Sequence, residues 1–582
     1  MKILAKILWG LVYALPAVLF FSYYPIISLG GNSSMNFELS LPLIWLVFFD
    51  LGSLVLLILL WRQVRRIELP GISDRRFFLL ALLPLYLTLS IFWSENPLRG
   101  ILTAGVVWLI FVAIFAILYI LPQTGTPQRL RCSVLGSLSI SGVLVGIWCF
   151  IQSILDTLGW PRENTLMCAG CSYRSFGFPH PSGFAIEPQF MGNLLLAPTL
   201  TALYLLISTK VIGKKPNKPS STQLVKCKNN GIAEYKATSW QYTGLCIVAG
   251  FLSLTLFFTF SRGAIYAYGV ALIVMMIMAL RRRLFRWALI TVPVISFILS
   301  LVVQGTFAEF GPTSESFGSA VSKSLHQLSL GIIDLRSLSE DTTKSVENSS
   351  TNCGKDVENT ANAVDNSCES VDKNVDKMQD LVENTPETVE IPTPKETDEE
   401  AIFEGYVPES TNIRLSLNKT AVKTWWQNPK NFLIGVGLGG AGTAMHNAFP
   451  DEVTSPKEIV QNEPFSLLLE TGLIGIVLVI FELLIIFFPK LFPGRFLDGR
   501  SYKVMWQRTQ LEQQKQRRGS SLGSWQHSAV VLLLPLLIAY FVTLNFFSGL
   551  PNALQIYLMP PLLYLILQKN LKKALLFSQN AL

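Results

Sequence analysis

The sequence predicts an all-α, polytopic membrane protein with about twelve membrane-spanning helices and one large extracytoplasmic loop. Half of the 582 residues are hydrophobic and only 15% are charged, which is the composition of a membrane protein. About a dozen apolar stretches reach the roughly 20 residues that a helix needs to cross a bilayer. The basic residues concentrate in every second segment between these stretches, so charge distinguishes the two sides of the membrane.

The apolar stretches form an N-terminal membrane domain of about nine helices in 1–304 and a C-terminal membrane domain of about three in 465–582. The first stretch lacks a convincing small-residue cleavage site, so we expect a retained helix rather than a signal peptide. An even number of spans leaves both termini on one side. The expected spans are 4–23, 41–61, 77–93, 99–121, 134–156, 183–208, 242–260, 264–280, 287–304, 465–489, 528–548 and 553–568.

The basic residues indicate which side is the cytoplasm. If the chain starts inside, the inner segments hold 31 of the 47 Lys and Arg, including seven Lys in 209–240 and eight basic residues in 489–527. Basic residues are retained on the cytoplasmic side, so both termini are expected there. Before residue 305 the outer segments hold only four arginines, which need a separate explanation: Arg99, Arg162, Arg174 and Arg262.

The long outer loop is acidic, unlike the rest of the chain. Residues 305–463 carry 26 acidic and 12 basic residues, a net −14, which leaves about +22 elsewhere against a total of +8. That excess faces anionic lipid headgroups, and no nucleic-acid partner is needed to explain it. Residues 305–405 form a low-complexity acidic insert for which disorder is predicted. Within it, apolar residues at heptad spacing favour a weakly stable helix at 356–383.

The remainder of that loop, 406–464, is expected to be structured. Residues 411–427 read as a helix with Thr411 as its cap, and Asn428-Pro429 stops it. The glycines of NFLIGVGLGGAG, residues 431–442, suit a tight turn that approaches a substrate. The residues expected on one face of the helix are Arg414, Asn418, Ala421 and Trp425.

Arg262 is the most informative charged residue. It lies in Ser-Arg-Gly-Ala between two apolar stretches, at the outer face and in a hairpin almost too short to be a loop. A charge there is costly unless it is paired or solvated. Its guanidinium either forks onto phosphate oxygens or extends to lipid headgroups. Arg174 is either a second such group or a surface arginine. Glu187 and Glu470, expected to be buried, are functional candidates or structural partners of arginines.

The histidines and cysteines give no metal signature. No two of the four histidines have metal-ligand spacing, so no metal site and no cofactor are expected. Cys168 and Cys171 form a lone C-x-x-C in an outer loop, which is weak evidence for a metal and is permitted as a disulfide. His446, beside Asn447, is the best candidate for proton transfer because an unperturbed histidine titrates near neutrality. It is otherwise an ordinary loop histidine.

Four motifs together resemble the O-antigen ligase and O-antigen polymerase superfamily. They are SRGA at a span junction, the Arg-x10-Trp-x2-Asn-Pro pattern followed by GVGLGG, the Glu-Thr-Gly-Leu-Ile-Gly entry into a span, and RSFGFPHPSGFAIEPQFMGNLL. The resemblance covers roughly 170–310 and 405–490. It implies a fold similar to C-type membrane glycosyltransferases, with Arg262 and Arg414 contacting a donor pyrophosphate and a base activating the acceptor hydroxyl.

One motif departs from the family pattern. The family usually has a His-Asn pair nine and eight residues before the glutamate that corresponds to Glu470. In this chain those positions are Gln461 and Asn462. Glutamine can orient an acceptor hydroxyl but cannot take its proton. The resemblance therefore leaves three options: His446 serves as the base, another group does, or the reaction differs.

The resemblance implies a bacterial plasma-membrane enzyme that acts on the extracytoplasmic side. It would transfer a glycan from a polyprenyl pyrophosphate, such as undecaprenyl pyrophosphate, to a glycan, lipid or protein acceptor during polysaccharide biosynthesis. Membrane lipids are the remaining partners. Two alternatives from other classes stay open. A transporter of a small anion would use the same arginines, and a non-catalytic scaffold of cell-envelope assembly would agree with the replaced histidine.

Overall fold

The structure is a computed structural model, and it is almost entirely helical. It describes residues 2–21, 25–29, 37–63, 79–121, 128–160, 180–185, 187–211, 235–237, 239–281, 284, 286–311, 316–329, 399–456, 460, 462–487, 523–546 and 554–567. The chain divides into two compact units, Met1–Val321 with Glu409–Leu582, and Ser322–Pro408. The features discussed below belong to the first unit, except for the first ten residues of the helix that starts at Glu399. The expected helix at 356–383 lies outside the described residues.

Each of the expected spans overlaps a helix. The helices of the N-terminal part are α1 (Lys2–Leu19), α2 (Leu41–Gln63), α4 (Leu82–Leu89) with the 3-10 turn η1 (Ser90–Trp93), α5 (Pro97–Phe115) with the π turn η2 (Ala116–Ile120), α7 (Gln128–Thr157), α9 (Pro188–Ser208), α10 (Ser239–Phe258), α11 (Arg262–Arg281) and α12 (Ala288–Phe310). Those of the C-terminal part are α18 (Glu463–Phe487), α20 (Gly523–Leu544) and α21 (Leu554–Leu567).

Eight helices in the described part of the chain are long and apolar enough to cross a membrane, which makes this a polytopic membrane protein. Three shorter apolar helices accompany them, at Ile3–Leu19, Leu82–Trp93 and Val531–Leu544. The total of about twelve spans stays a prediction. Two small sheets depart from the all-α prediction. Strand β1 (Pro25–Leu29) pairs antiparallel with β2 (Phe37–Ser40), and β3 (Thr209–Val211) pairs parallel with β4 (Tyr235–Ala237).

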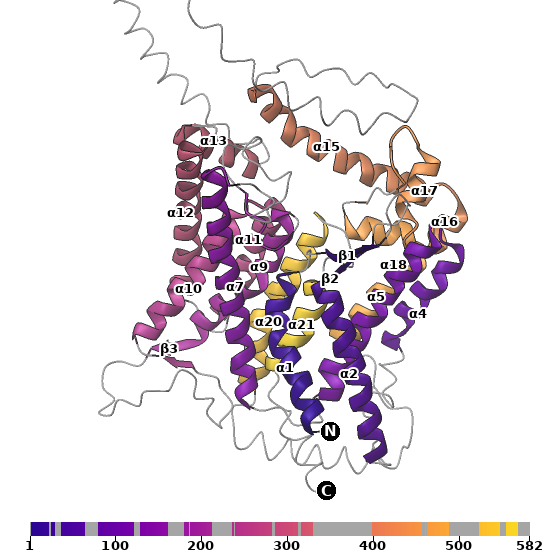
Figure 1. Cartoon of the computed structure of the whole chain (residues 1–582), viewed down its shortest axis with the longest axis horizontal. Helices are drawn as coiled ribbons and strands as arrows, with labels where there is room; N and C mark the ends of the chain where they lie inside the picture. The colour runs from indigo at the N-terminus through magenta and orange to yellow at the C-terminus, as the bar shows by residue number, and fades with distance from the viewer. Residues whose placement is uncertain are drawn as a thin grey trace, which may run out of the picture. The chain divides into compact units, whose positions relative to one another are not determined.

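Helix α9 is the centre of the membrane core. Its apolar residues surround the whole helix, which is typical of a helix buried on every side, and 94% of its span is buried. It packs against α7, α10, α11 and α20 (Figure 1). Small residues let the neighbours approach closely: a Cβ on Gly142 of α7 would lie 2.9 Å from Cβ of Pro198 in α9.

The remaining helices extend this core in two ways. Helices α1, α2, α5 and α21 pack together, with α1 also against α7. Helix α18 packs against α4 and against the short helix α16 (Pro429–Ile434). Helix α18 is interrupted at Gly472, whose backbone is left-handed (φ 63°). The glycine-rich segment after α16 packs between this break and the junction of η1 with α5: a Cβ on Gly472 would lie 2.5 Å from Gly435 N, and a Cβ on Gly437 would lie 2.4 Å from Cα of Ser94.

Helix α15 (Glu399–Trp426) differs from the expected helix at 411–427. The assignment of Thr411 as a cap is wrong because the helix begins twelve residues earlier. Residues before Thr411 are helical, so their carbonyl groups already accept the N–H groups that a cap would satisfy. The expected end is confirmed: Asn428 caps the next helix by accepting from Asn431 N at 2.8 Å. Arg414, Asn418, Ala421 and Trp425 share the less exposed face, as expected.

Candidate active site

Arg262 begins α11 after a very tight hairpin. Only residues 259–261 separate α10 from α11, and Phe260 has φ +54°, the one positive φ of a non-glycine residue in the described part of the chain. The Ser261 hydroxyl accepts from Ala264 N at 3.4 Å and caps the helix. Backbone strain of this kind persists only where the surroundings hold it, and it is common at functional sites.

The Arg262 guanidinium retains hydrogen-bonding capacity. The side chain is half-buried, and Nη1 is fully buried without a hydrogen-bond partner among the residues that the structure describes. A buried, unsatisfied guanidinium nitrogen is costly, so a ligand that supplies oxygen acceptors would be favoured there. The helix N-terminus adds its own partial positive charge. Arg262, which the sequence singles out, therefore has a donor nitrogen that no described residue uses.

Helix α9 connects Arg262 to Arg414. A Cβ on Gly192 would lie 2.7 Å from Cβ of Ser261 and 2.8 Å from Cβ of Ala264, so the first turns of α9 touch the start of α11. Glu187, which precedes α9, lies within electrostatic reach of Arg414 on α15. The two arginines are thus joined through the amino-terminal end of one buried helix.

Glu187 is not buried as expected, because its side chain is exposed. Nearby atoms still desolvate the carboxyl group enough to raise its pKa, and Arg414 and the hydrogen bond from Gln189 offset part of that rise. The Gln189 amide donates to Glu187 Oε2 at 2.8 Å. Glu187 therefore lies within electrostatic reach of an arginine, and its role stays a prediction.

The ends of α18 and α20 meet the same hairpin. A Cβ on Gly263 would lie 2.9 Å from Cβ of Phe546, and the rings of Tyr266 and Phe546 are 6.1 Å apart. Asn462 donates from Nδ2 to Asn545 O at 3.1 Å. Its Oδ1 accepts from Phe465 N at 3.2 Å, which caps α18. Asn462 was predicted to be catalytic, and its amide is engaged in these two structural bonds.

A buried histidine that sequence reasoning gave no role also contacts the hairpin. The His180 ring packs edge-on against Phe260, with centroids 5.4 Å apart. Gln152 of α7 holds the His180 segment by donating to Gly183 O at 2.8 Å and accepting from Gly183 N at 2.9 Å. Burial lowers the pKa of His180 to about 3, so the ring is neutral at physiological pH. A neutral ring adds no charge beside Arg262.

The glycine-rich turn is needed for close backbone packing. Gly435, Gly437 and Gly439 all have positive φ (74°, 90° and 75°). Val436 N donates to Leu469 O at 2.9 Å, and Gly437 N donates to Glu470 O at 3.0 Å. A Cβ on Gly435 would lie 2.4 Å from the Glu470 carbonyl. The glycines therefore let this turn pack against the backbone of α18.

The Glu470 side chain is bound within the protein. Its carboxylate accepts from the backbone N–H groups of Gly439 and Ala441 and lies within electrostatic reach of Arg99. Ala441 begins α17 (Ala441–Ala448), so the carboxylate also stabilises a helix start. The sequence predicts that Arg99 faces outward but indicates no role for it at the site. No sequence spacing links it to Glu470.

His446 lies on α17 and has a defined tautomer. Its Nδ1 is 2.7 Å from Val453 O. A carbonyl oxygen only accepts, so Nδ1 carries the proton, and in the neutral ring the lone pair is on Nε2. This is the arrangement that a neutral general base requires. Two of the predicted site residues, Arg174 and Gln461, lie outside the described residues.

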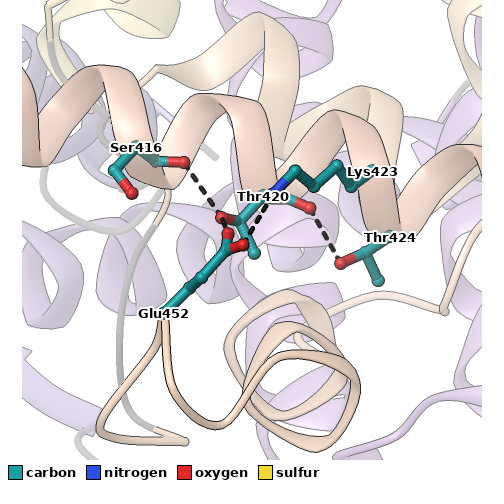
Figure 2. Close-up of polar contacts among 5 residues, drawn as sticks. All are labelled: Ser416, Thr420, Lys423, Thr424 and Glu452. Atoms are coloured by element: carbon teal, nitrogen blue, oxygen red, sulfur yellow. Dashed lines mark hydrogen bonds and ion pairs between the residues drawn. The ribbon is translucent and has the colours of Figure 1, made fainter.

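Helix α15 holds the segment that follows α17. Thr420 Oγ1 lies 2.5 Å from Glu452 Oε2, and Lys423 Nζ lies 2.6 Å from Glu452 Oε1 (Figure 2). Lys423 also lies over the Phe449 ring, 5.3 Å from its centroid. These contacts lower the pKa of Glu452, chiefly through the hydrogen bond from Lys423. Arg414 and the contacts to the His446 segment therefore belong to one helix.

The fold and the site define a polytopic helical membrane protein whose half-buried arginine lies where several helix ends meet. The family model described as O-antigen ligase matches residues 247–480, which is 234 of the 582 residues, so this part of the chain is similar to O-antigen ligases. The match includes Arg262, Arg414, His446 and Glu470. No curated protein matches the chain. This similarity supports a glycosyltransferase-like enzyme of cell-envelope polysaccharide assembly.

Proposed function

We propose that the protein transfers a glycan from a polyprenyl pyrophosphate carrier to a glycan, lipid or protein acceptor at the extracytoplasmic face of the membrane. The observation that carries this proposal is the buried Nη1 of Arg262, which has no hydrogen-bond partner among the described residues and lies at the start of a membrane-spanning helix. A lipid-linked donor fits that location because its chain lies in the bilayer while its pyrophosphate lies at the surface. Arg414 is the second arginine, reached through α9 and Glu187.

The reaction needs charge stabilisation more than a metal ion. The acceptor hydroxyl attacks the anomeric carbon, the bond from that carbon to the phosphate oxygen breaks, and the polyprenyl pyrophosphate leaves with the electron pair. Guanidinium groups fork onto phosphate oxygens, and the start of α11 adds backbone N–H groups and a favourable dipole. Arg262 and Arg414 would stabilise the negative charge that develops on the leaving group.

His446 is proposed as the general base. Its Nδ1–H is held by Val453 O, which leaves Nε2 to take the proton from the acceptor hydroxyl. The other predicted residues take supporting roles in this proposal. Glu187 orients Arg414, and Glu470 holds the glycine-rich turn together with Arg99. Asn462 holds the start of α18, beside Gln461, which would orient the acceptor, and Arg174 would assist at the donor phosphates.

Binding of polyprenyl pyrophosphate to the purified protein in detergent tests the donor site. Arg262→Ala removes the guanidinium and is expected to weaken binding by about 10- to 100-fold, since hydrogen bonds to charged groups contribute roughly 1.5–3 kcal/mol. Arg262→Lys is expected to weaken it as well, because lysine cannot make the bidentate contact. Arg281→Ala, at the other end of α11, is the matched control and should bind normally.

Polysaccharide formation in cells that express each variant tests transfer. The arginine variants are expected to lose product at unchanged protein abundance, while Arg281→Ala keeps it. A fully active Arg262→Lys variant that binds donor normally would overturn the donor-site proposal. It would leave Arg262 as a group that anchors the helix end at the membrane surface.

A further inference from the structure

The turn after α17 connects Glu452 to the proposed base. Phe449 N donates to Met445 O at 2.9 Å, so the chain leaves α17 without a break. Glu452 N and Val453 N then both donate to Phe449 O, at 3.1 Å and 3.0 Å. The Val453 carbonyl accepts from His446 Nδ1. The side chain of Glu452 and the carbonyl that orients His446 therefore belong to neighbouring residues of one tight turn.

Helix α15 fixes that turn from outside. Both carboxylate oxygens of Glu452 are bonded, one to Thr420 and one to Lys423 (Figure 2). Thr420 is fully buried, whereas Lys423 and Glu452 are partly exposed, with side-chain exposures of 51% and 36%. An exposed ion pair alone contributes little to folding stability. The buried threonine hydroxyl distinguishes this arrangement because it gives the carboxylate one fixed position.

The same helix carries the second donor arginine. Arg414 precedes Thr420 by six residues, which corresponds to about 9 Å along a helix. A rigid helix that holds both the arginine and the turn would keep the base at a constant distance from the leaving group. Transfer reactions are sensitive to such distances, and a misplacement of about 1 Å lowers a rate by roughly 100-fold.

We infer that Glu452, held by Thr420 and Lys423 of α15, is a positioning residue that sets the place of His446 relative to the donor site. The inference rests on the proposed function, in which His446 is the base. Glu452 does not touch the substrate. It acts through the turn at 449–453 and the Val453 carbonyl, and it links the alignment of the base to the helix that binds the donor.

Steady-state transfer from a polyprenyl pyrophosphate-linked glycan by the full-length protein tests the inference. Glu452→Gln weakens the contact to Lys423 and is expected to lower kcat by about 10- to 100-fold, with the KM for the donor unchanged. Thr420→Val should lower kcat in the same way. Thr420→Ser keeps the hydroxyl and should have the kcat of the natural protein. Asp451→Asn changes the adjacent exposed acid and should have no effect.

A double-mutant comparison separates positioning from general structural damage. In a His446→Ala background the Glu452→Gln change should lower kcat no further, because the group that it positions is gone. Equal losses in both backgrounds would overturn the inference, as would a silent Glu452→Gln when His446→Ala is impaired. A silent His446→Ala would overturn the base assignment and this inference together, while donor binding by Arg262 would still stand.

Discussion

The Glu187 carboxylate lies within electrostatic reach of the Arg414 guanidinium. This interaction joins the start of the buried helix α9 to helix α15. Gly192, in the next turn of α9, touches Ser261 and Ala264 at the start of α11. The pairing therefore explains how two arginines that are far apart in the chain belong to one end of the helical core. It also identifies Glu187 as a counter-charge for an arginine that is proposed to bind an anion.

Glu187→Gln is expected to change how stability depends on pH. The pKa of Glu187 is raised above its ordinary value, mainly by desolvation, so its ionisation opposes folding. The protonated Glu187 side chain therefore adds to the free energy of unfolding below the unfolded-state pKa, and this contribution is lost as pH rises through the folded-state pKa. The Tm of Glu187→Gln relative to the natural protein should therefore increase between pH 4 and pH 7, measured by thermal unfolding in detergent.

Glu452→Gln is the matched comparison because the pKa of Glu452 is lowered, chiefly by Lys423. Its contribution is present above the unfolded-state pKa and is lost as pH falls through the folded-state pKa. The relative Tm of this variant should decrease between pH 3 and pH 7. Slopes of the same sign for the two variants would contradict the assigned environments.

Gly435→Ala is expected to destabilise the protein. The backbone of Gly435 is left-handed, and a Cβ there would lie 2.4 Å from the Glu470 carbonyl. The left-handed backbone alone costs about 1–3 kcal/mol for a residue with a side chain, and the clash adds to it. Gly105→Ala in α5 is the control, since a Cβ there meets open space, and it should stabilise by about 0.5–1 kcal/mol. Chemical or thermal unfolding of both variants gives the comparison.

Arg99→Ala and Glu470→Gln are expected to affect stability rather than donor binding. Each variant removes one side of the contact that holds the glycine-rich turn. Each should therefore lower the free energy of unfolding by roughly 1–3 kcal/mol. Because the residues share that contact, the double variant should lose less than the sum of the single losses. Loss of polyprenyl pyrophosphate binding at unchanged stability would instead make Glu470 a substrate-binding residue, as the sequence suggested.

The basic residues predict a topology that labelling can check. A cysteine placed at position 400 should react with a membrane-impermeant maleimide in intact cells, because 305–463 is expected outside. A cysteine at position 220, in the Lys-rich segment 209–240, should react only after permeabilisation. The eight natural cysteines are replaced first, so that each signal has one source. Reaction at position 400 only in permeabilised cells would reverse the orientation.

Much of the fold follows from local sequence. Apolar stretches of membrane length predicted where helices form, because the bilayer selects for length and apolarity one segment at a time. Arg262 was found in the same way, since a charge between two adjacent spans is conspicuous. The start of α15 was missed because polar, acidic residues before Thr411 resemble a disordered insert, and no apolar period marks the helix there.

The sequence by itself determined the class of protein, the helices, the glycine-rich turn and the motifs of the O-antigen ligase superfamily, because each depends on neighbouring residues. Only the tertiary structure decided the partners of the charged groups. Arg99 with Glu470, Arg414 with Glu187, and Glu452 with Thr420 and Lys423 each join separate elements. The tautomer of His446 likewise depends on the carbonyl that faces it. Such pairings depend on how helices pack, and no spacing along the chain encodes them.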